Sequence, residues 1–160
     1  MSASPLARRM GFRVVAIGRG SDIADDARTL GAHVYLDAGQ QDAPARLQEI
    51  GGAQAILSTI GDAATVSVLL AGPALRGRPV PLGAGKDSLA VSAGPLVVGR
   101  RSVMGSVTGS PVDKEKTLTF SVLAGVRPLI EKMPLARAYG AYSRMKSGNV
   151  KFRMVLTMHE

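Results

Sequence analysis

The stretch that decides the fold is Phe12-Arg13-Val14-Val15-Ala16-Ile17-Gly18-Arg19-Gly20-Ser21-Asp22. Nearly every position in residues 12–17 is apolar, which is typical of a parallel strand covered on both faces. A strand that ends in a glycine turn and enters a helix has the form of the second strand of a dinucleotide-binding half. The first strand, with its Gly-x-Gly-x-x-Gly phosphate turn, should precede it, but residues 1–11 contain no such turn. The sequence therefore predicts most of a cofactor site without its phosphate loop.

Strands and helices alternate along the rest of the chain. This alternation predicts an α/β fold, Rossmann-like and doubly wound, with a mostly parallel sheet, helices on both faces and the first strand missing. No linker or internal repeat is present, so residues 1–160 are predicted to form a single, incomplete dinucleotide-binding domain. The predicted strands are 12–17, 34–36, 53–60, 79–82, 103–107 and 152–158, and the predicted helices are 5–10, 23–30 with Asp22 as cap, 43–50, 63–71, 114–124 with Asp113 as cap, and 135–146.

Two prolines fit this pattern badly. Pro79 and Pro81 fall in a segment that should be an interior strand. A proline lacks the N–H that a strand donates to its neighbour, and it is normally confined to edges or bulges. Either the strand at residues 79–82 is irregular, or the sequence has drifted from a better-formed ancestor.

Composition places the chain among globular proteins and excludes several kinds of chemistry. The 160 residues are 46% hydrophobic and 20% charged, which suits one folded domain. No cysteine is present, so disulfides, thiolate catalysis and cysteine-ligated zinc are excluded within this chain. His33 and His159 are far apart and show no metal-ligand spacing. No metal site is predicted.

The charge pattern does not favour nucleic acid or membrane partners. The net charge is +8, but the basic residues are scattered and no aromatic platform lies between them. No apolar run approaches the roughly 20 residues of a membrane span, and the first residues lack the apolar core of a signal peptide. We expect a cytoplasmic protein that binds neither nucleic acid nor membrane.

Four glycine-containing turns follow consecutive predicted strands. In a doubly wound sheet, ligands bind at the carboxyl ends of the strands, and small residues let a backbone approach a ligand closely. Any single turn of this kind is explained better as an ordinary strand-to-helix connection, which also favours glycine. Four of them in succession favour a binding site. The turns are Ile17-Gly18-Arg19-Gly20-Ser21, Thr59-Ile60-Gly61, Leu82-Gly83-Ala84-Gly85 and Gly105-Ser106-Val107-Thr108.

The first turn bears on the choice of cofactor. An NAD site usually has an acid at the end of the second strand, where it holds the ribose 2′-hydroxyl. Here Gly18-Arg19 occupies that place, and the arginine offers a forked cation to a 2′-phosphate. The alternative, that Arg19 is only exposed to solvent and binds no phosphate, explains an arginine at this position equally well. If a dinucleotide binds, NADP(H) is favoured over NAD(H).

No catalytic residue is predicted. Gly83-Ala84-Gly85-Lys86 lacks the first glycine and the Ser/Thr of a P-loop, since Asp87 follows the lysine. Tyr142 and Lys146 have the spacing of the Tyr-x-x-x-Lys pair of short-chain dehydrogenases, but no helical segment with a serine partner precedes them. We interpret Tyr142 as a packing residue and Lys146 as a cation at a helix end.

Taken in order, several segments resemble one family. The resemblance is to the cofactor-binding half of medium-chain, zinc-type alcohol dehydrogenases, and it runs from about Leu6 to Met158. The order and spacing of the segments carry it more than any one motif. They are Ala27-Arg28-Thr29-Leu30-Gly31-Ala32, Leu75-Arg76-Gly77-Arg78, Met104-Gly105-Ser106, and Met145-Lys146-Ser147-Gly148 with Arg153-Met154-Val155-Leu156.

The resemblance implies roles for particular residues and a dinucleotide cofactor. It also implies that residues 104–107 lie near a subunit interface, so that a homodimer or a partner chain is expected. The implied cofactor-binding residues are Gly18 and Arg19 at the adenosine ribose, Gly20 and Ser21 of the same turn, Thr59, Ile60 and Gly61 against that ribose and the nicotinamide side, Leu82, Gly83, Ala84, Ser106 and Val107 at the nicotinamide ring, and Arg153 at the pyrophosphate.

Two departures from the family pattern shape the functional hypotheses. Nothing corresponds to the N-terminal domain whose cysteine and histidine bind the catalytic zinc, and the first strand with its glycine turn is missing. The chain is therefore expected to be a truncated or split member, without zinc and inactive alone. The missing strand would lie between residues 12–17 and 53–60, and its absence exposes two strand edges. The alternative hypothesis is a non-catalytic interaction module that pairs through these edges with another chain or with itself.

Overall fold

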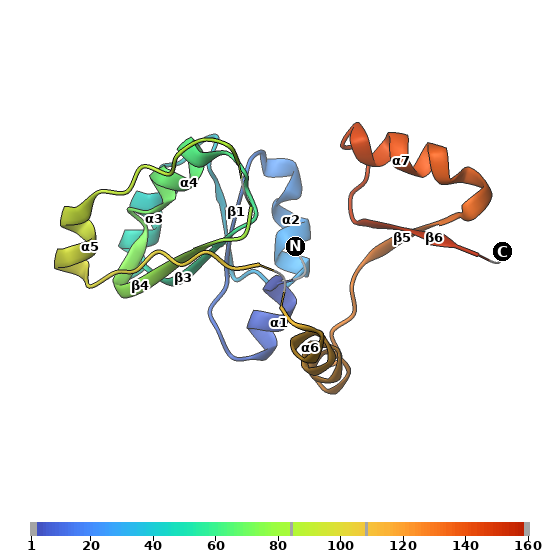
Figure 1. Ribbon diagram of the computed structural model, residues 1–160, viewed down its shortest axis with the longest axis horizontal. Helices are drawn as coiled ribbons and strands as arrows, with labels where there is room; N and C mark the ends of the chain where they lie inside the picture. The colour runs from blue at the N-terminus through green and yellow to red at the C-terminus, as the bar shows by residue number, and fades with distance from the viewer. Residues whose placement is uncertain (1–2, 84, 108, 159–160) are drawn as a thin grey trace. The chain divides into compact units, whose positions relative to one another are not determined.

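The computed structural model describes residues 3–83, 85–107 and 109–158, which form two compact units. The first unit extends to Lys114 and the second begins at Glu115, within one helix. The first unit contains α1 (Ala3–Arg9), β1 (Val15–Gly18), a 3₁₀ turn (Ser21–Ile23), α2 (Ala24–Thr29), β2 (Val34–Asp37), α3 (Ala43–Glu49), β3 (Ala53–Ser58), α4 (Ala63–Leu69), β4 (Pro73–Pro81) and α5 (Ala93–Gly99) (Figure 1). Then follow α6 (Pro111–Leu123), β5 (Ile130–Pro134), a 3₁₀ turn (Leu135–Arg137), α7 (Ala138–Lys146) and β6 (Arg153–Thr157).

The first unit is built on two parallel strand pairs that share one apolar core. β1 pairs with β2, and β3 pairs with β4. Side chains of α3 and α4 pack with side chains of both strand pairs in one buried cluster. Leu47 of α3 is among its most completely buried residues. Val15 and Ile17 of β1 pack against this cluster, which comprises Leu36, Ala43, Leu47, Ile56 and Leu69.

The α/β class and the mostly parallel pairing are confirmed, and the described strands pair two by two. Among the described residues, no ladder joins β1 to β3. The break falls between the strands that the sequence analysis identified as flanking a missing strand. The physical reason is that a parallel sheet needs a strand in register between these two edges, and no described segment lies there.

β4 begins at Pro73 rather than at residue 79, because its first half is a bulge. Ala53 of β3 is opposite Pro73, and Ala55 is opposite Arg78. Between these two pairs, β4 therefore has more residues than β3, which is a bulge. Gly77 belongs to the bulge, and a Cβ there would come 2.5 Å from the carbonyl oxygen of Ala53. Pro79, Val80 and Pro81, within the predicted strand at residues 79–82, do pair with β3, opposite Ile56, Leu57 and Ser58.

The predicted strand at residues 103–107 is not formed as a strand, and the two prolines explain why. The amides of Ser102, Met104 and Ser106 donate to the carbonyls of Gly77, Pro79 and Pro81 at 3.5, 3.1 and 3.2 Å. A parallel ladder would also need N–H donors at positions 79 and 81, which prolines lack. Half of the ladder is therefore missing. The irregularity expected from the prolines is confirmed, on the edge of β4 that faces away from β3.

Replacing both prolines should complete this ladder. In the variant Pro79→Val/Pro81→Val, the new amides face the carbonyls of Ser102 and Met104. Each new hydrogen bond adds about 1 kcal/mol, partly offset by the greater freedom of the unfolded chain without proline. Amide hydrogen exchange at positions 79 and 81 should be slowed at least tenfold relative to an exposed loop amide. Exchange at the unprotected rate would show that residues 102–106 do not run along β4.

Two predicted helix caps are wrong. Asp113 lies in the first turn of α6, and Ser110 is the capping partner: Asp113 accepts from the Ser110 amide at 2.9 Å, and its own amide donates to the Ser110 hydroxyl at 3.2 Å. This reciprocal pair is a capping box. The helix was predicted to begin at residue 114, but α6 begins at Pro111. Asp22 lies in a 3₁₀ turn and does not cap α2. The helix α5 and the strand β5 were not predicted.

The second unit is a parallel β5-α7-β6 arrangement that one carboxylate ties together. β5 and β6 pair from Ile130 with Arg153 to Pro134 with Thr157. Glu131 of β5 accepts from the Lys151 amide at 2.9 Å and from the Arg144 guanidinium of α7 at 2.7 Å. Both hydrogen bonds lower the pKa of Glu131, and the one from the Lys151 amide has the larger effect.

Acid should loosen this unit through Glu131. Because its pKa is lowered in the folded state, its stabilising effect is complete above the carboxyl pKa of the unfolded chain and is lost as the pH falls through the lowered value. The Lys151 amide resonance should therefore move with pH in this acid range. In Glu131→Gln that pH dependence should disappear and the melting temperature at neutral pH should fall. An unchanged Lys151 titration in the variant would contradict the assignment.

Within the described part of the chain, no helix is both long enough and apolar enough to cross a membrane.

Candidate functional site

The turn after β1 is held by side chains of β2. The Gly20 amide donates to Asp37 at 3.0 Å, and its carbonyl accepts from the Tyr35 hydroxyl at 2.6 Å. Gly20 has φ +89°, a conformation that favours glycine. Gly18 is required for packing, since a Cβ there would lie 2.7 Å from Ile23 and 2.9 Å from the Tyr35 hydroxyl. The first predicted turn is thus rigid, with the Arg19 side chain exposed.

Tyr35 is kept in its protonated, donating form. Burial raises its pKa, and the negative charges of Asp37 and Asp22 raise it further. The hydroxyl can therefore hold the Gly20 carbonyl throughout the physiological pH range.

The turns after β3 and β4 pack directly on each other. The Ser58 carbonyl accepts from the amides of both Leu82 and Gly83, at 2.7 and 3.2 Å. A Cβ at Gly83 would lie 2.6 Å from the Ile60 carbonyl oxygen and 2.7 Å from that of Thr59. The close approach of these two backbone segments therefore requires a glycine at position 83.

An electrostatic contact connects the first turn to the second. Asp62 caps α4 by accepting from the Thr65 amide at 2.8 Å and from the Thr65 hydroxyl. These two hydrogen bonds lower the pKa of Asp62, and the positive charge of Arg19 lowers it further. Arg19, at the carboxyl end of β1, therefore lies within electrostatic reach of Asp62 in the turn after β3.

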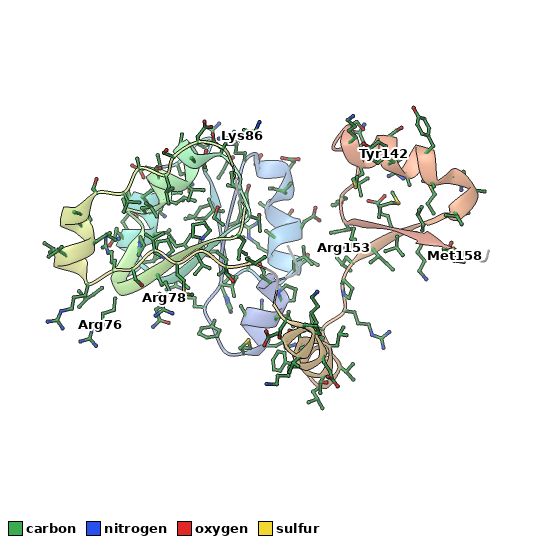
Figure 2. All side chains as sticks on the ribbon, viewed as in Figure 1. Arg76, Arg78, Lys86, Tyr142, Arg153 and Met158 are labelled. Atoms are coloured by element: carbon green, nitrogen blue, oxygen red, sulfur yellow. The ribbon has the colours of Figure 1, made fainter. Side chains whose placement is uncertain are left out.

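The fourth turn joins the same edge through β4. The Ser106 amide donates to the carbonyl of Pro81 at 3.2 Å, so residues 106 and 107 follow the end of β4. Three apolar side chains are left uncovered along this edge: Ile60 is 43% exposed, Leu82 43% and Val107 88%. Lys86 lies on the loop after β4 (Figure 2).

Most of the predicted site residues are thus brought together. We call this set the carboxyl edge. Ala84 lies outside the described residues, and Arg153 is the first residue of β6 in the second unit (Figure 2). The carboxyl edge comprises Gly18, Arg19, Gly20, Ser21, Thr59, Ile60, Gly61, Leu82, Gly83, Ser106 and Val107.

Sequence reasoning missed Asp37. The absence of an acid directly after residues 12–17 suggested a turn free of carboxylates, but Asp37 reaches this turn from β2 and Asp22 lies beside Gly20. Asp37 also accepts from the Gly39 amide at 2.9 Å, so it holds both the turn after β1 and the backbone that follows β2. Its position at the end of the neighbouring strand is the signal that could have identified it.

The chemistry of the carboxyl edge suits an elongated ligand with both anionic and apolar parts. Arg19 offers a cation, the glycine turns expose backbone, and the three uncovered apolar side chains offer a surface for a ring. Within residues 3–83, 85–107 and 109–158, no group of three or more potential ligands is placed to hold a metal ion.

Comparisons with known proteins agree with this fold. The family model described as zinc-binding dehydrogenase matches residues 1–123. The alcohol dehydrogenase patD of Penicillium expansum is 36% identical over 152 residues, which cover 95% of this chain and 44% of the relative. The probable formaldehyde dehydrogenase AdhA of Bacillus subtilis is 28% identical over 96% of this chain and 44% of its own length. The chain thus spans less than half the length of these curated relatives.

Solved structures show the same likeness. The cinnamyl alcohol dehydrogenase SbCAD4 of Sorghum bicolor is 26% identical with a TM-score of 0.82, over 99% of this chain and 46% of that one. The alcohol dehydrogenase of the archaeon Aeropyrum pernix has a TM-score of 0.84 at 24% identity, over 97% of this chain and 46% of that one.

Proposed function

Because the chain belongs to the zinc-binding dehydrogenase family, we propose that it is the dinucleotide-binding part of an alcohol dehydrogenase-like oxidoreductase. The observation that carries this proposal is the joining of four turns, far apart in sequence, into one carboxyl edge. A dinucleotide supplies or accepts a hydride when it is bound. We propose that residues 1–160 form one dinucleotide-binding domain.

The residues present fit such a ligand in three respects. The exposed Arg19 suits a phosphate, the turn at Gly20 is already rigid, and Ile60 and Leu82 are left uncovered where a ring could pack. We propose that Arg19 contacts the adenosine ribose and its 2′-phosphate, and that the turns at Thr59 and Gly83 border the nicotinamide side. The role of Arg153, which belongs to the second unit, stays a prediction.

We propose NADP(H) in preference to NAD(H). Asp37 faces the same turn, but its Oδ1 already accepts two backbone amides, whereas among the described residues no hydrogen bond or ion pair engages the Arg19 guanidinium. A forked cation at this place favours a phosphate over a hydroxyl.

Removing the Arg19 cation should weaken NADPH binding selectively. In Arg19→Ala, isothermal titration calorimetry should show about a tenfold weaker NADPH affinity, the loss of one charge-assisted contact, and little change for NADH. Arg13→Ala is the matched control, because it removes the same charge from the other end of β1. Equal losses for both cofactors, or an equal effect of Arg13→Ala, would contradict the role of Arg19.

We expect no alcohol dehydrogenase turnover by the isolated chain. The sequence contains no cysteine, and the described residues provide no metal-ligating group. Zinc-dependent oxidation of an alcohol by the purified chain would overturn this expectation. That the chain forms a homodimer or binds a partner chain stays a prediction. Its cytoplasmic location stays a prediction as well.

A second candidate function is favoured by the break between β1 and β3. Strand edges without partners are templates for pairing with other polypeptides. We propose that the chain also acts as an interaction module through these edges.

A further inference from the structure

Two hydrogen bonds bring four arginines of the first unit together. The Nε of Arg101 donates to the Ala74 carbonyl at 3.3 Å, and the Ser102 amide donates to the Gly77 carbonyl at 3.5 Å. These contacts place the residues that follow α5 beside the bulge of β4, and both segments carry neighbouring arginines. We call this set the arginine cluster, which comprises Arg76, Arg78, Arg100 and Arg101.

The positive charges of the arginine cluster are not compensated by ion pairs. Arg76, Arg78 and Arg100 are exposed, and among the described residues no hydrogen bond or ion pair engages their guanidinium groups. Asp87 is the only acidic residue between positions 63 and 112 of the sequence. The fold thus gathers cations from two separate segments at a place where carboxylates are scarce.

Two of the arginines occupy backbone conformations that favour glycine. Arg76 has φ +59° and Arg100 has φ +47°, both in the left-handed region. Arg100 also caps the C-terminus of α5, where glycine is a usual residue. Glycine would make both turns with less strain, so the turns themselves do not explain why arginine is present. The exposed guanidinium groups offer the explanation.

The arginine cluster is separate from the carboxyl edge. Arg78 is opposite Ala55 within β3, whereas the turns of the carboxyl edge follow the last residues of β3 and β4. Figure 2 shows Arg76 and Arg78 on the side of the first unit away from Lys86, which lies on the loop after β4. The cluster therefore offers a second place for a ligand.

We propose that the arginine cluster binds an oligophosphate, a ligand with several phosphate groups in a row. A guanidinium can donate two parallel hydrogen bonds to one phosphate, and several neighbouring cations suit a ligand whose negative charges lie close together. This chemistry has two possible sources, a free inorganic oligophosphate and the phosphate chain of a nucleotide. The site is independent of the dinucleotide proposed for the carboxyl edge.

The surroundings of the cluster favour a small anion over an acidic peptide or a nucleic acid. Residues 102–106 run along the adjacent edge of β4, where the amides of Ser102 and Met104 donate to it, so this edge is not available for strand addition by a peptide. Residues 63–112 contain no phenylalanine, tyrosine or tryptophan. The segment that carries the cluster therefore has no ring on which a base could stack.

Inorganic triphosphate is the probe for this site. It is titrated into the full chain by isothermal titration calorimetry without divalent cations, and we expect saturable binding of one triphosphate per chain. Inorganic monophosphate should bind about tenfold more weakly or worse, because it reaches fewer guanidinium groups. ATP, titrated in the same way, distinguishes the sources. Binding as tight as that of triphosphate supports a nucleotide, and much weaker binding supports a free oligophosphate.

Glycine substitutions separate binding from folding. Arg76→Gly and Arg100→Gly each remove a cation and relieve a left-handed residue, so the melting temperature should be retained while triphosphate and ATP bind about tenfold more weakly. Arg127→Ala is the matched control, because it removes the same charge from an exposed arginine of the second unit and should leave both affinities unchanged. Arg78→Lys keeps the charge and loses the fork, so it should also weaken binding.

Three results would overturn the proposal. The first is absence of saturable triphosphate binding, or equally tight binding of monophosphate. The second is an equal loss in Arg127→Ala and Arg76→Gly, which would show diffuse attraction to the net charge of +8. The third is a loss in Arg19→Ala but not in Arg76→Gly, which would place the ligand at the carboxyl edge. NADPH should bind Arg76→Gly as it binds the wild type, so failure of one site is distinguishable from failure of the other.

Discussion

Leu47→Ala should destabilise the first unit more than any other single truncation of a side chain. Leu47 is only 2% exposed and belongs to the cluster with Leu36, Ile56 and Leu69, so it joins both strand pairs through α3. Shortening it removes apolar contact and leaves a cavity, at a cost of about 3 kcal/mol. Since domains of this size are stable by only about 5–15 kcal/mol, and no ladder joins the two pairs, we expect the melting temperature to fall by roughly 10 °C.

The matched control for this variant is Val98→Ala. Val98 lies in α5 and is 84% exposed, so its truncation removes an apolar side chain without opening a cavity. Urea denaturation followed by circular dichroism should show a lower midpoint for Leu47→Ala and an unchanged midpoint for Val98→Ala. Equal effects of the two variants would mean that the two strand pairs do not share a core.

Gly83→Ala should have the second large effect, because it forces apart the turns that build the carboxyl edge. The added Cβ would meet the carbonyl oxygens of Ile60 and Thr59 at 2.6 and 2.7 Å, and these are backbone atoms that cannot turn aside. We expect a loss of about 3 kcal/mol, at the upper end of overpacking effects. NADPH binding should fall at least tenfold, because the turns after β3 and β4 must separate.

Gly94→Ala is the control for this glycine. It lies in α5, where an added Cβ meets nothing within 4 Å, so the substitution should be neutral or stabilise by up to about 1 kcal/mol. Thermal melts and NADPH titrations of both variants provide the comparison. If Gly83→Ala binds NADPH like the wild type, the contact between the two turns has no part in the site.

Local patterns were sufficient to predict most of the elements and the turns that follow the strands. The apolar run that contains β1, the glycine at position 20 and the helices α3 and α4 follow from burial and turn chemistry within about ten residues of sequence. The four turns could be identified as one edge because parallel strands present their carboxyl ends together. The structure joins these turns through Arg19 and Asp62, Gly83 and Ile60, and Ser106 and Pro81.

What could not be predicted depends on contacts between distant segments. The bulge in β4 arises because Ala55 pairs with Arg78, and nothing near residue 73 in the sequence specifies that register. Asp37 enters the first turn from another strand, so an analysis of residues 12–22 alone omits it. The loss of the strand at residues 103–107 follows from prolines more than twenty positions earlier, whose effect appears only when the two segments lie side by side.

The most direct test of the central claim, that the carboxyl edge binds a dinucleotide, is a thermal melt of the full chain by circular dichroism with and without NADPH. A ligand that binds only the folded state raises its stability by about 1.4 kcal/mol at ten times its dissociation constant, which corresponds to a shift of about 4 °C for a chain of this size. The account predicts one cooperative transition whose midpoint rises with NADPH concentration, and a smaller rise for Arg19→Ala. A transition that NADPH does not move at any concentration up to several millimolar would contradict it.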